Sequence, residues 1–75
     1  MIKIEEVTTG DRTIVIRGKM INTDEWKNYL SKAIKGIINE TDYAISDDDL
    51  TRKINAQTAG NPEQEINFIV QINKP

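Results

Sequence analysis

The chain has 75 residues, no cysteine, no histidine and a formal net charge of −2. This composition excludes disulfides, thiol nucleophiles, zinc-finger ligation and the commonest general base near pH 7. The small charge favours neither nucleic acid nor an anionic membrane, and the length predicts a single domain over residues 1–75.

The first two elements that the sequence predicts are strands. Ile2 and Ile4 alternate with polar neighbours, which is typical of a short strand. Residues 13–20 alternate again, and the turn cluster at residues 8–11 separates the two runs. Gly18 interrupts the second run and indicates a bulge. The pattern therefore predicts an antiparallel hairpin.

Residues 23–40 change to helical spacing and predict one long amphipathic helix. Asn22 and Glu25 have capping-box spacing, so Asn22 is the expected N-cap. Trp26 begins the apolar stripe, and we expect it to close the core rather than to anchor a partner. The stripe consists of Trp26, Leu30, Ala33, Ile34, Ile37 and Ile38.

The periodic signal is weakest between residues 41 and 60, where two alternatives stay open. We favour a short helix over residues 47–57, because Ser46 can cap it and three consecutive aspartates suit a helix N-terminus. The alternative is a fourth strand over residues 51–57. The aspartates lack the alternate spacing of a calcium loop, so we expect them to bind no metal.

Residues 65–73 predict the last strand, with apolar side chains at Ile66, Phe68, Val70 and Ile72 on one face. Its place in the sheet depends on the preceding segment. A second helical crossing predicts the strand order 1-2-3, and a single crossing predicts 2-1-3. The expected fold is two-layer α+β, with a three-stranded antiparallel sheet covered on one face by the long helix (β-β-α-(α)-β).

No motif for catalysis or cofactor binding is present. Ser31 and Ser46 have no histidine to activate them, and the glycines form no phosphate-binding loop. We therefore predict no catalytic, cofactor-binding or metal-binding residues, and a protein that is not an enzyme. The absence of cysteine fits the cytoplasm, and the first residues resemble neither a signal peptide nor a membrane span.

The face of the sheet that points away from the helix is the candidate functional surface, and three hypotheses concern it or its surroundings. The first is a protein contact, with a partner or with a second copy of the chain, and its candidate residues are Val15, Ile21, Ile69 and Gln71. The alternative is nucleic-acid binding through Lys3, Arg17, Lys19, Asn67 and Gln71, although that face lacks the aromatic residues of stacking platforms. A third, weaker hypothesis has acidic residues 40–49 facing a basic partner protein. No membrane partner is expected.

Overall fold

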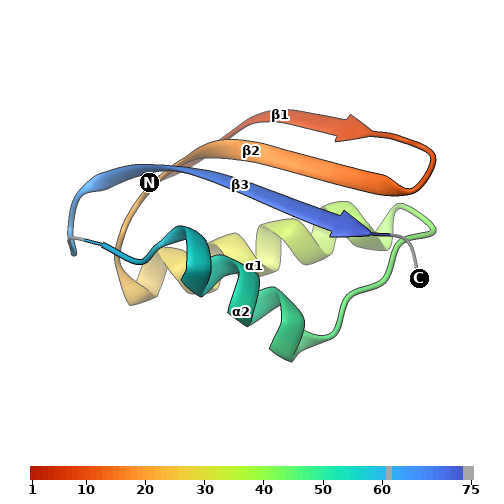
Figure 1. The fold of residues 1–75 in the computed structure, drawn as a ribbon. Coiled ribbons are helices and arrows are strands. Elements are labelled where there is room, and N and C mark those ends of the chain that lie inside the picture. The colour runs from red at the N-terminus through yellow and green to blue at the C-terminus, as the bar shows by residue number, and fades with distance from the viewer. Residues whose placement is uncertain (61, 74–75) are drawn as a thin grey trace.

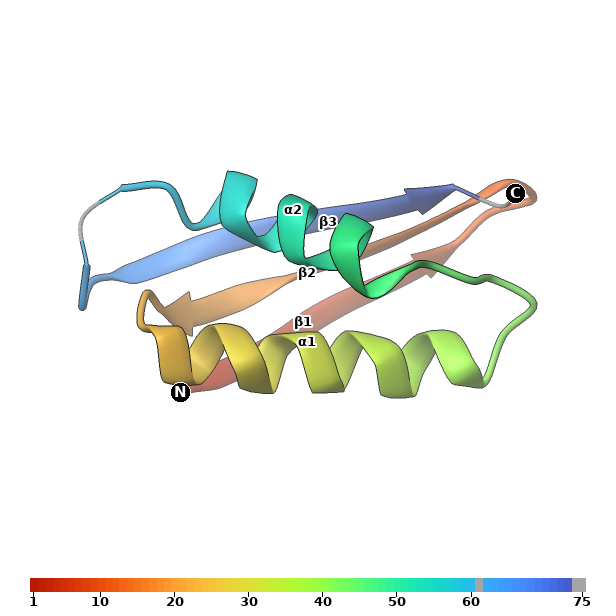
Figure 2. The ribbon, with the colours of Figure 1, turned by 90° about the horizontal axis from the view of Figure 1, so that it is seen from below.

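The computed structural model describes residues 1–60 and 62–73. Three strands form one antiparallel sheet, and two helices lie side by side against a single face of it (Figures 1 and 2). The predicted α+β class is confirmed. The elements in chain order are β1 (Ile2–Thr9), β2 (Thr13–Ile21), α1 (Asp24–Asn39), α2 (Asp47–Gln57) and β3 (Glu65–Asn73).

The segment that gave the weakest sequence signal is a helix and not a strand. Helix α2 begins after Ser46, whose hydroxyl oxygen accepts a hydrogen bond from the Asp49 backbone N–H at 3.2 Å. Because α1 and α2 each cross the sheet, the chain returns to the end at which β2 finishes (Figure 1). β3 therefore runs antiparallel to β2 and lies beside it, which gives the order β1-β2-β3.

The bulge that Gly18 indicated is present, but it lies in β1, on the strand that pairs with the glycine. The register slips between Ile4 and Glu6, so that Ile4 faces Gly18 and Glu6 faces Arg17. A Cβ atom at Gly18 would lie 2.1 Å from the Lys3 carbonyl oxygen. The bulge needs the space that only glycine leaves there.

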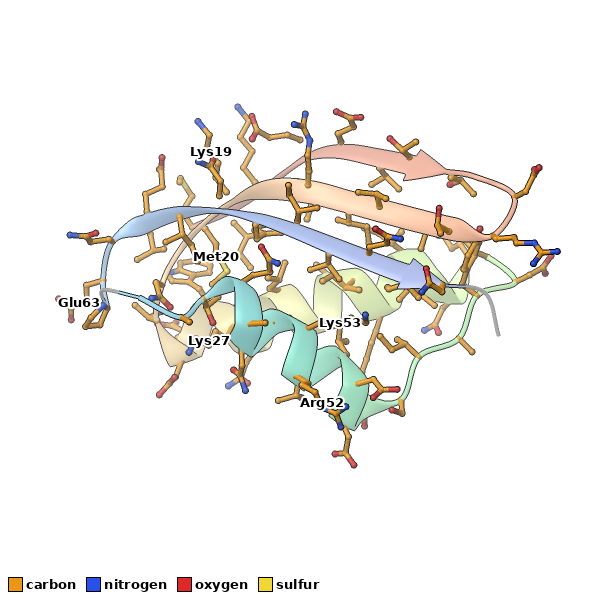
Figure 3. The ribbon with its side chains drawn as sticks, viewed as in Figure 1. Lys19, Met20, Lys27, Arg52, Lys53 and Glu63 are labelled. Atoms are coloured by element: carbon orange, nitrogen blue, oxygen red, sulfur yellow. The ribbon has the colours of Figure 1, made fainter. Side chains whose placement is uncertain are left out.

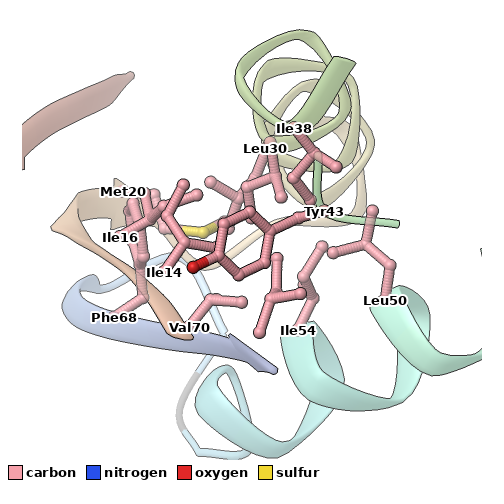
Figure 4. Packing of buried hydrophobic residues seen from close by; sticks show 12 residues of the cluster. Ile14, Ile16, Met20, Leu30, Ile38, Tyr43, Leu50, Ile54, Phe68 and Val70 are labelled. Carbon is pink, nitrogen blue, oxygen red and sulfur yellow. The ribbon is translucent and has the colours of Figure 1, made fainter. Parts of the chain in front are cut away.

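Alternate strand residues and one stripe of each helix form the core between the layers (Figure 4). Phe68 is fully buried and lies opposite Gly18 in the β2–β3 register. Its ring occupies the volume above the glycine, since a Cβ at Gly18 would lie 2.8 Å from the Phe68 Cζ atom. Trp26 packs against this core and contacts Tyr29, with ring centroids 5.3 Å apart. The buried apolar residues are Ile14, Ile16, Met20, Leu30, Ile34, Ile38, Tyr43, Leu50, Ile54, Phe68, Val70 and Ile72.

The predicted N-cap of the long helix is wrong by one residue. Thr23 caps α1, and its hydroxyl oxygen accepts a hydrogen bond from the Trp26 N–H at 3.2 Å. Asn22 is instead buried, and its side-chain amide donates to the Thr58 carbonyl oxygen at 2.9 Å. Local spacing assigned Asn22 to the helix cap, but its side chain forms a long-range hydrogen bond to the end of α2 instead.

Tyr43 joins the connection between the helices to the tip of the β1–β2 hairpin. Its hydroxyl lies 2.7 Å from the Gly10 carbonyl oxygen and 3.0 Å from the Thr13 carbonyl oxygen, and it donates its proton toward them. The ring is buried in the core. The long connection between α1 and α2 is therefore attached to the sheet by packing and by hydrogen bonding.

Candidate protein-contact face of the sheet

The outer face of the sheet, on the side away from both helices, consists of alternate residues of the three strands. Figure 3 shows Lys19 pointing away from the helices and its neighbour Met20 pointing toward them. The register arranges the face in rows across the strands. Three of these rows are Lys3–Lys19–Asn67, Glu6–Arg17–Ile69 and Thr8–Val15–Gln71.

Three of the four predicted protein-contact residues come together on this face. Val15 pairs directly with Gln71, and Ile69 is the next outward residue along β3. Ile69 is 52% exposed, which makes it the most exposed of the large apolar residues that the structure describes. We call Val15, Ile69 and Gln71 the outer patch.

Ile21 does not belong to the outer patch. It lies opposite Glu65 at the far end of β2, two outward rows from the Arg17–Ile69 row, with Lys19 and Asn67 between them. The sequence assigned Ile21 to the correct face. The register was needed to show that it lies too far along the strand to join the other three.

The basic residues of the same face separate into two groups. Lys3 and Lys19 lie directly opposite each other, with Asn67 beside them. Arg17 forms an ion pair with Glu6, with 2.7 Å between Nη2 and Oε2, and each side chain is about half exposed. Arg17 therefore has an intramolecular acceptor, whereas the two lysines form a concentration of positive charge.

Sequence reasoning missed Glu6 on this face, and the bulge explains why. Strict alternation from Ile2 and Ile4 would turn Glu6 toward the helices. The extra residue in β1 reverses the parity, so that Glu6 joins the outer face and Val7 pairs with buried Ile16. The apolar Val7 at an odd position was the signal that could have revealed the reversal.

Glu6 is the acidic side chain whose titration the outer face alters most clearly. A hydrogen bond from the Thr8 hydroxyl to Oε1, at 3.0 Å, is the largest cause and lowers the pKa of Glu6 below its ordinary value. The Arg17 guanidinium lowers it further by charge and by hydrogen bonding. Glu6 therefore stays ionised at neutral pH and keeps Arg17 in place.

The free edge of β3 borders the outer patch and was not singled out by the sequence. The Ile69 backbone N–H donates to the Gln57 side-chain oxygen at 3.3 Å, so this N–H points away from β2. An open groove runs between α2 and β3 beneath this edge, and Figure 3 shows Lys53 in the same region. The groove is lined by Lys53, Ala56, Gln57, Ile69, Val70 and Gln71.

The acidic run at the start of α2 is partly engaged in ion pairs. Asp47 pairs with Lys35 of α1, and Asp49 pairs with Arg52 one turn along α2. Among the residues that the structure describes, no three acidic side chains gather closely enough to hold a metal ion. In the same part of the chain, neither helix is long and apolar enough to cross a membrane.

Comparison with models of known protein families, with curated protein sequences and with solved structures finds no match to this chain. No relative therefore assigns a role to the outer face.

Proposed function

We propose that this chain is a small, non-enzymatic protein-binding module and that its contact surface is the outer patch of Val15, Ile69 and Gln71. The observation that carries the proposal is the exposure of Ile69 at a position where Val15 and Gln71 adjoin it. An exposed apolar residue with a polar rim is the arrangement that small protein contacts use.

The surroundings of the outer patch suit a partner that carries both apolar and polar groups. Arg17 and Glu6 lie in the same row as Ile69 and offer one charge of each sign. Thr8 and Gln71 add hydroxyl and amide groups beside Val15. Such mixed rims favour register and specificity more than affinity. We propose a regulatory role in the cytoplasm for this contact, in keeping with the acidic and cysteine-free composition.

Site-specific photocrosslinking tests the proposal. A photoreactive amino acid at Val15 should capture a discrete partner in lysate of the native cells, because this position lies within the contact. The same amino acid at exposed Lys32 on α1 provides the matched control. Equal capture at both positions, or capture at Val15 that an excess of the Val15→Glu chain removes as well as wild type does, contradicts the proposal.

A second candidate function, nucleic-acid binding, is supported by one observation. Lys3 and Lys19 lie opposite each other with Asn67 alongside, and lysine and amide groups contact phosphates and bases. The ion pair of Arg17 with Glu6 weakens this candidate, because it neutralises the third cation of the face. Retardation of a nucleic acid in a low-salt gel shift, lost in Lys3→Glu and Lys19→Glu, would favour it, and no retardation by wild type would exclude it.

A further inference from the structure

The two edges of the sheet differ in how well they resist pairing with another strand. β1 carries a bulge between Ile4 and Glu6 and charged side chains at Lys3, Glu5 and Glu6. Bulges and charges are the usual devices that keep an edge strand from joining a neighbouring sheet. The β1 edge is therefore protected.

The β3 edge has neither device. Its register with β2 is unbroken from Glu65 to Asn73, and it has no charged residue after Glu65. Its nine residues extend over about 30 Å. An uncharged, regular edge strand of this length is a template for strand addition.

The backbone of β3 presents every second residue to that edge. The Ile69 N–H points away from β2, because it donates to Gln57. The backbone N–H and C=O groups of successive residues in an antiparallel strand point alternately to its two neighbours, so those of residues 65, 67, 71 and 73 also point away from β2. Together with Ile69, these are the five residues whose N–H and C=O groups a further strand would meet.

We propose that a second copy of this chain pairs with β3 in antiparallel orientation, edge to edge, with the twofold axis at Ile69. The two three-stranded sheets then join into one sheet of six strands. This inference deepens the proposed function and rests on it, because it names one partner of the region around the outer patch.

β3 is complementary to itself in this register, which is why the proposed occupant is a second copy. Ile69 is the central residue of the strand, so an axis there pairs all nine residues. Ile69 faces Ile69 of the second copy, and Asn67 faces Gln71 of the second copy, where the two amides can exchange hydrogen bonds. Glu65 faces Asn73 of the second copy, so no like charges oppose each other.

Other registers leave part of the strand without a partner. An axis at Asn67 would place Glu65 opposite Ile69 and leave residues 70–73 unmatched, and an axis at Gln71 would leave residues 65–68 unmatched. The central axis is therefore the one that uses the whole edge. The Gln57 side chain is exposed and can hydrogen-bond to water instead, so it can release the Ile69 N–H to the carbonyl of Ile69 in the second copy.

Pairing along one strand should bury less surface than a standard protein interface, which buries about 800 Å² per partner. The dimer should therefore be weak, and its population should depend on protein concentration. Sedimentation velocity over a range from micromolar to millimolar protein should show conversion of monomer to dimer. Amide hydrogen exchange at the dimer end of the range should slow at Asn67, Ile69 and Gln71. The exchange rates of Phe68 and Val70 should change little, because their backbone N–H groups already point toward β2.

Charge exchange at the axis tests the register directly. Ile69→Lys and Ile69→Glu should each remain monomeric, because the axis brings two like charges together, and an equimolar mixture of the two should dimerise. Ile69 is half-exposed on the outer face, so both variants should keep the native circular dichroism. Val7→Glu is the matched control, because Val7 is an exposed apolar residue on β1 at the opposite edge of the sheet, and this variant should dimerise as wild type does.

Three results would overturn the inference: a wild-type chain that stays monomeric throughout the range, a dimer that tolerates both single variants, or a mixture that fails to dimerise. These results differ from a failure of the proposed function. A strict monomer that is still crosslinked through Val15 to another protein would refute the second copy alone. A dimer with the expected variant behaviour, but no other protein captured at Val15, would leave self-association as the only contact of this region.

Discussion

The inner and outer faces of this sheet are built from neighbouring residues of the same strands, yet they differ in burial. On β2, Ile14, Ile16 and Met20 are fully buried, whereas Arg17 between them is exposed. On β3, buried Phe68 adjoins Ile69, which is 52% exposed. The inner face is constrained by contacts with two helices, whereas none of the described elements covers the outer face. Substitutions should therefore affect stability on the inner face and binding on the outer face.

Phe68→Ala should cause the largest loss of stability, about 3–5 kcal/mol, because it removes a fully buried ring and leaves a cavity over Gly18. This approaches the whole stability of a domain of this size, and urea unfolding monitored by circular dichroism measures it. The outer-face control is Ile69→Ala on the adjacent residue, which should cost no more than about 1 kcal/mol. Equal losses for the two variants would contradict the difference between the faces.

Gly18→Ala should destabilise by about 1–3 kcal/mol, because the new Cβ would overlap the Lys3 carbonyl oxygen and press on the Phe68 ring. Gly36→Ala is the matched control and should have the opposite sign. Gly36 is exposed in the last turn of α1 and a Cβ there meets nothing within 4 Å, so alanine should stabilise by up to about 1 kcal/mol. Thermal unfolding of the two variants measures both effects. A neutral Gly18→Ala would show that β1 can rearrange its bulge.

Tyr43→Phe should lower the free energy of unfolding by about 1 kcal/mol. The variant keeps the buried ring but loses the hydroxyl that donates toward the Gly10 and Thr13 carbonyl oxygens of the hairpin. Tyr29→Phe provides the comparison, since Tyr29 is half-exposed on α1 and its ring contact with Trp26 is kept. Denaturant unfolding should separate the two variants, and hydrogen exchange should locate the Tyr43 effect at residues 10–13. An unchanged hairpin in Tyr43→Phe would disprove the attachment.

The smallest effect should come from Glu6 on the outer face and should depend on pH. The pKa of Glu6 is lower in the folded chain than its ordinary value of 4.5, so its ionised form stabilises the fold at neutral pH. That contribution is lost as the pH falls through the lowered pKa. Stability should therefore decline less on acidification in Glu6→Gln than in wild type, measured by urea unfolding at a series of pH values. Parallel curves for the two chains would contradict the role of Thr8 and Arg17.

The periodic parts of the sequence predicted most of the inner face. The stripe of α1 and the alternation of β2 and β3 identified residues that are buried or partly buried, because side chains repeat every 3.6 residues in a helix and every two in a strand. The predicted helix over residues 23–40 differs from Asp24–Asn39 by one residue at each end. The strand order was open, and the second helical crossing decided it.

The outer face was less predictable, because long-range pairing decides where its residues lie. Parity alone placed Ile21 with Val15 and Ile69, but the register separates it from them. Strict alternation from Ile2 and Ile4 would turn Glu6 inward, but a bulge opposite Gly18 places it on the outer face. The prediction of Asn22 as the N-cap was wrong for the same kind of reason. Its hydrogen-bond partner, Thr58, lies 36 residues further along the chain, and no local pattern indicates that pairing. The protein-binding role itself stays a prediction.

The late position of β3 in the chain has a consequence for synthesis. β2 cannot complete its ladder until β3 is available, and the pairs that join them are separated by 44 residues at Ile21–Glu65 and by 60 at Thr13–Asn73. Phe68, Val70 and Ile72 also supply a large share of the core. A nascent chain that has reached only α2 therefore holds a hairpin and two helices with no closed interior. We expect the complete fold to form only after residue 73 has left the exit tunnel, and pairing this distant in sequence to set the folding rate.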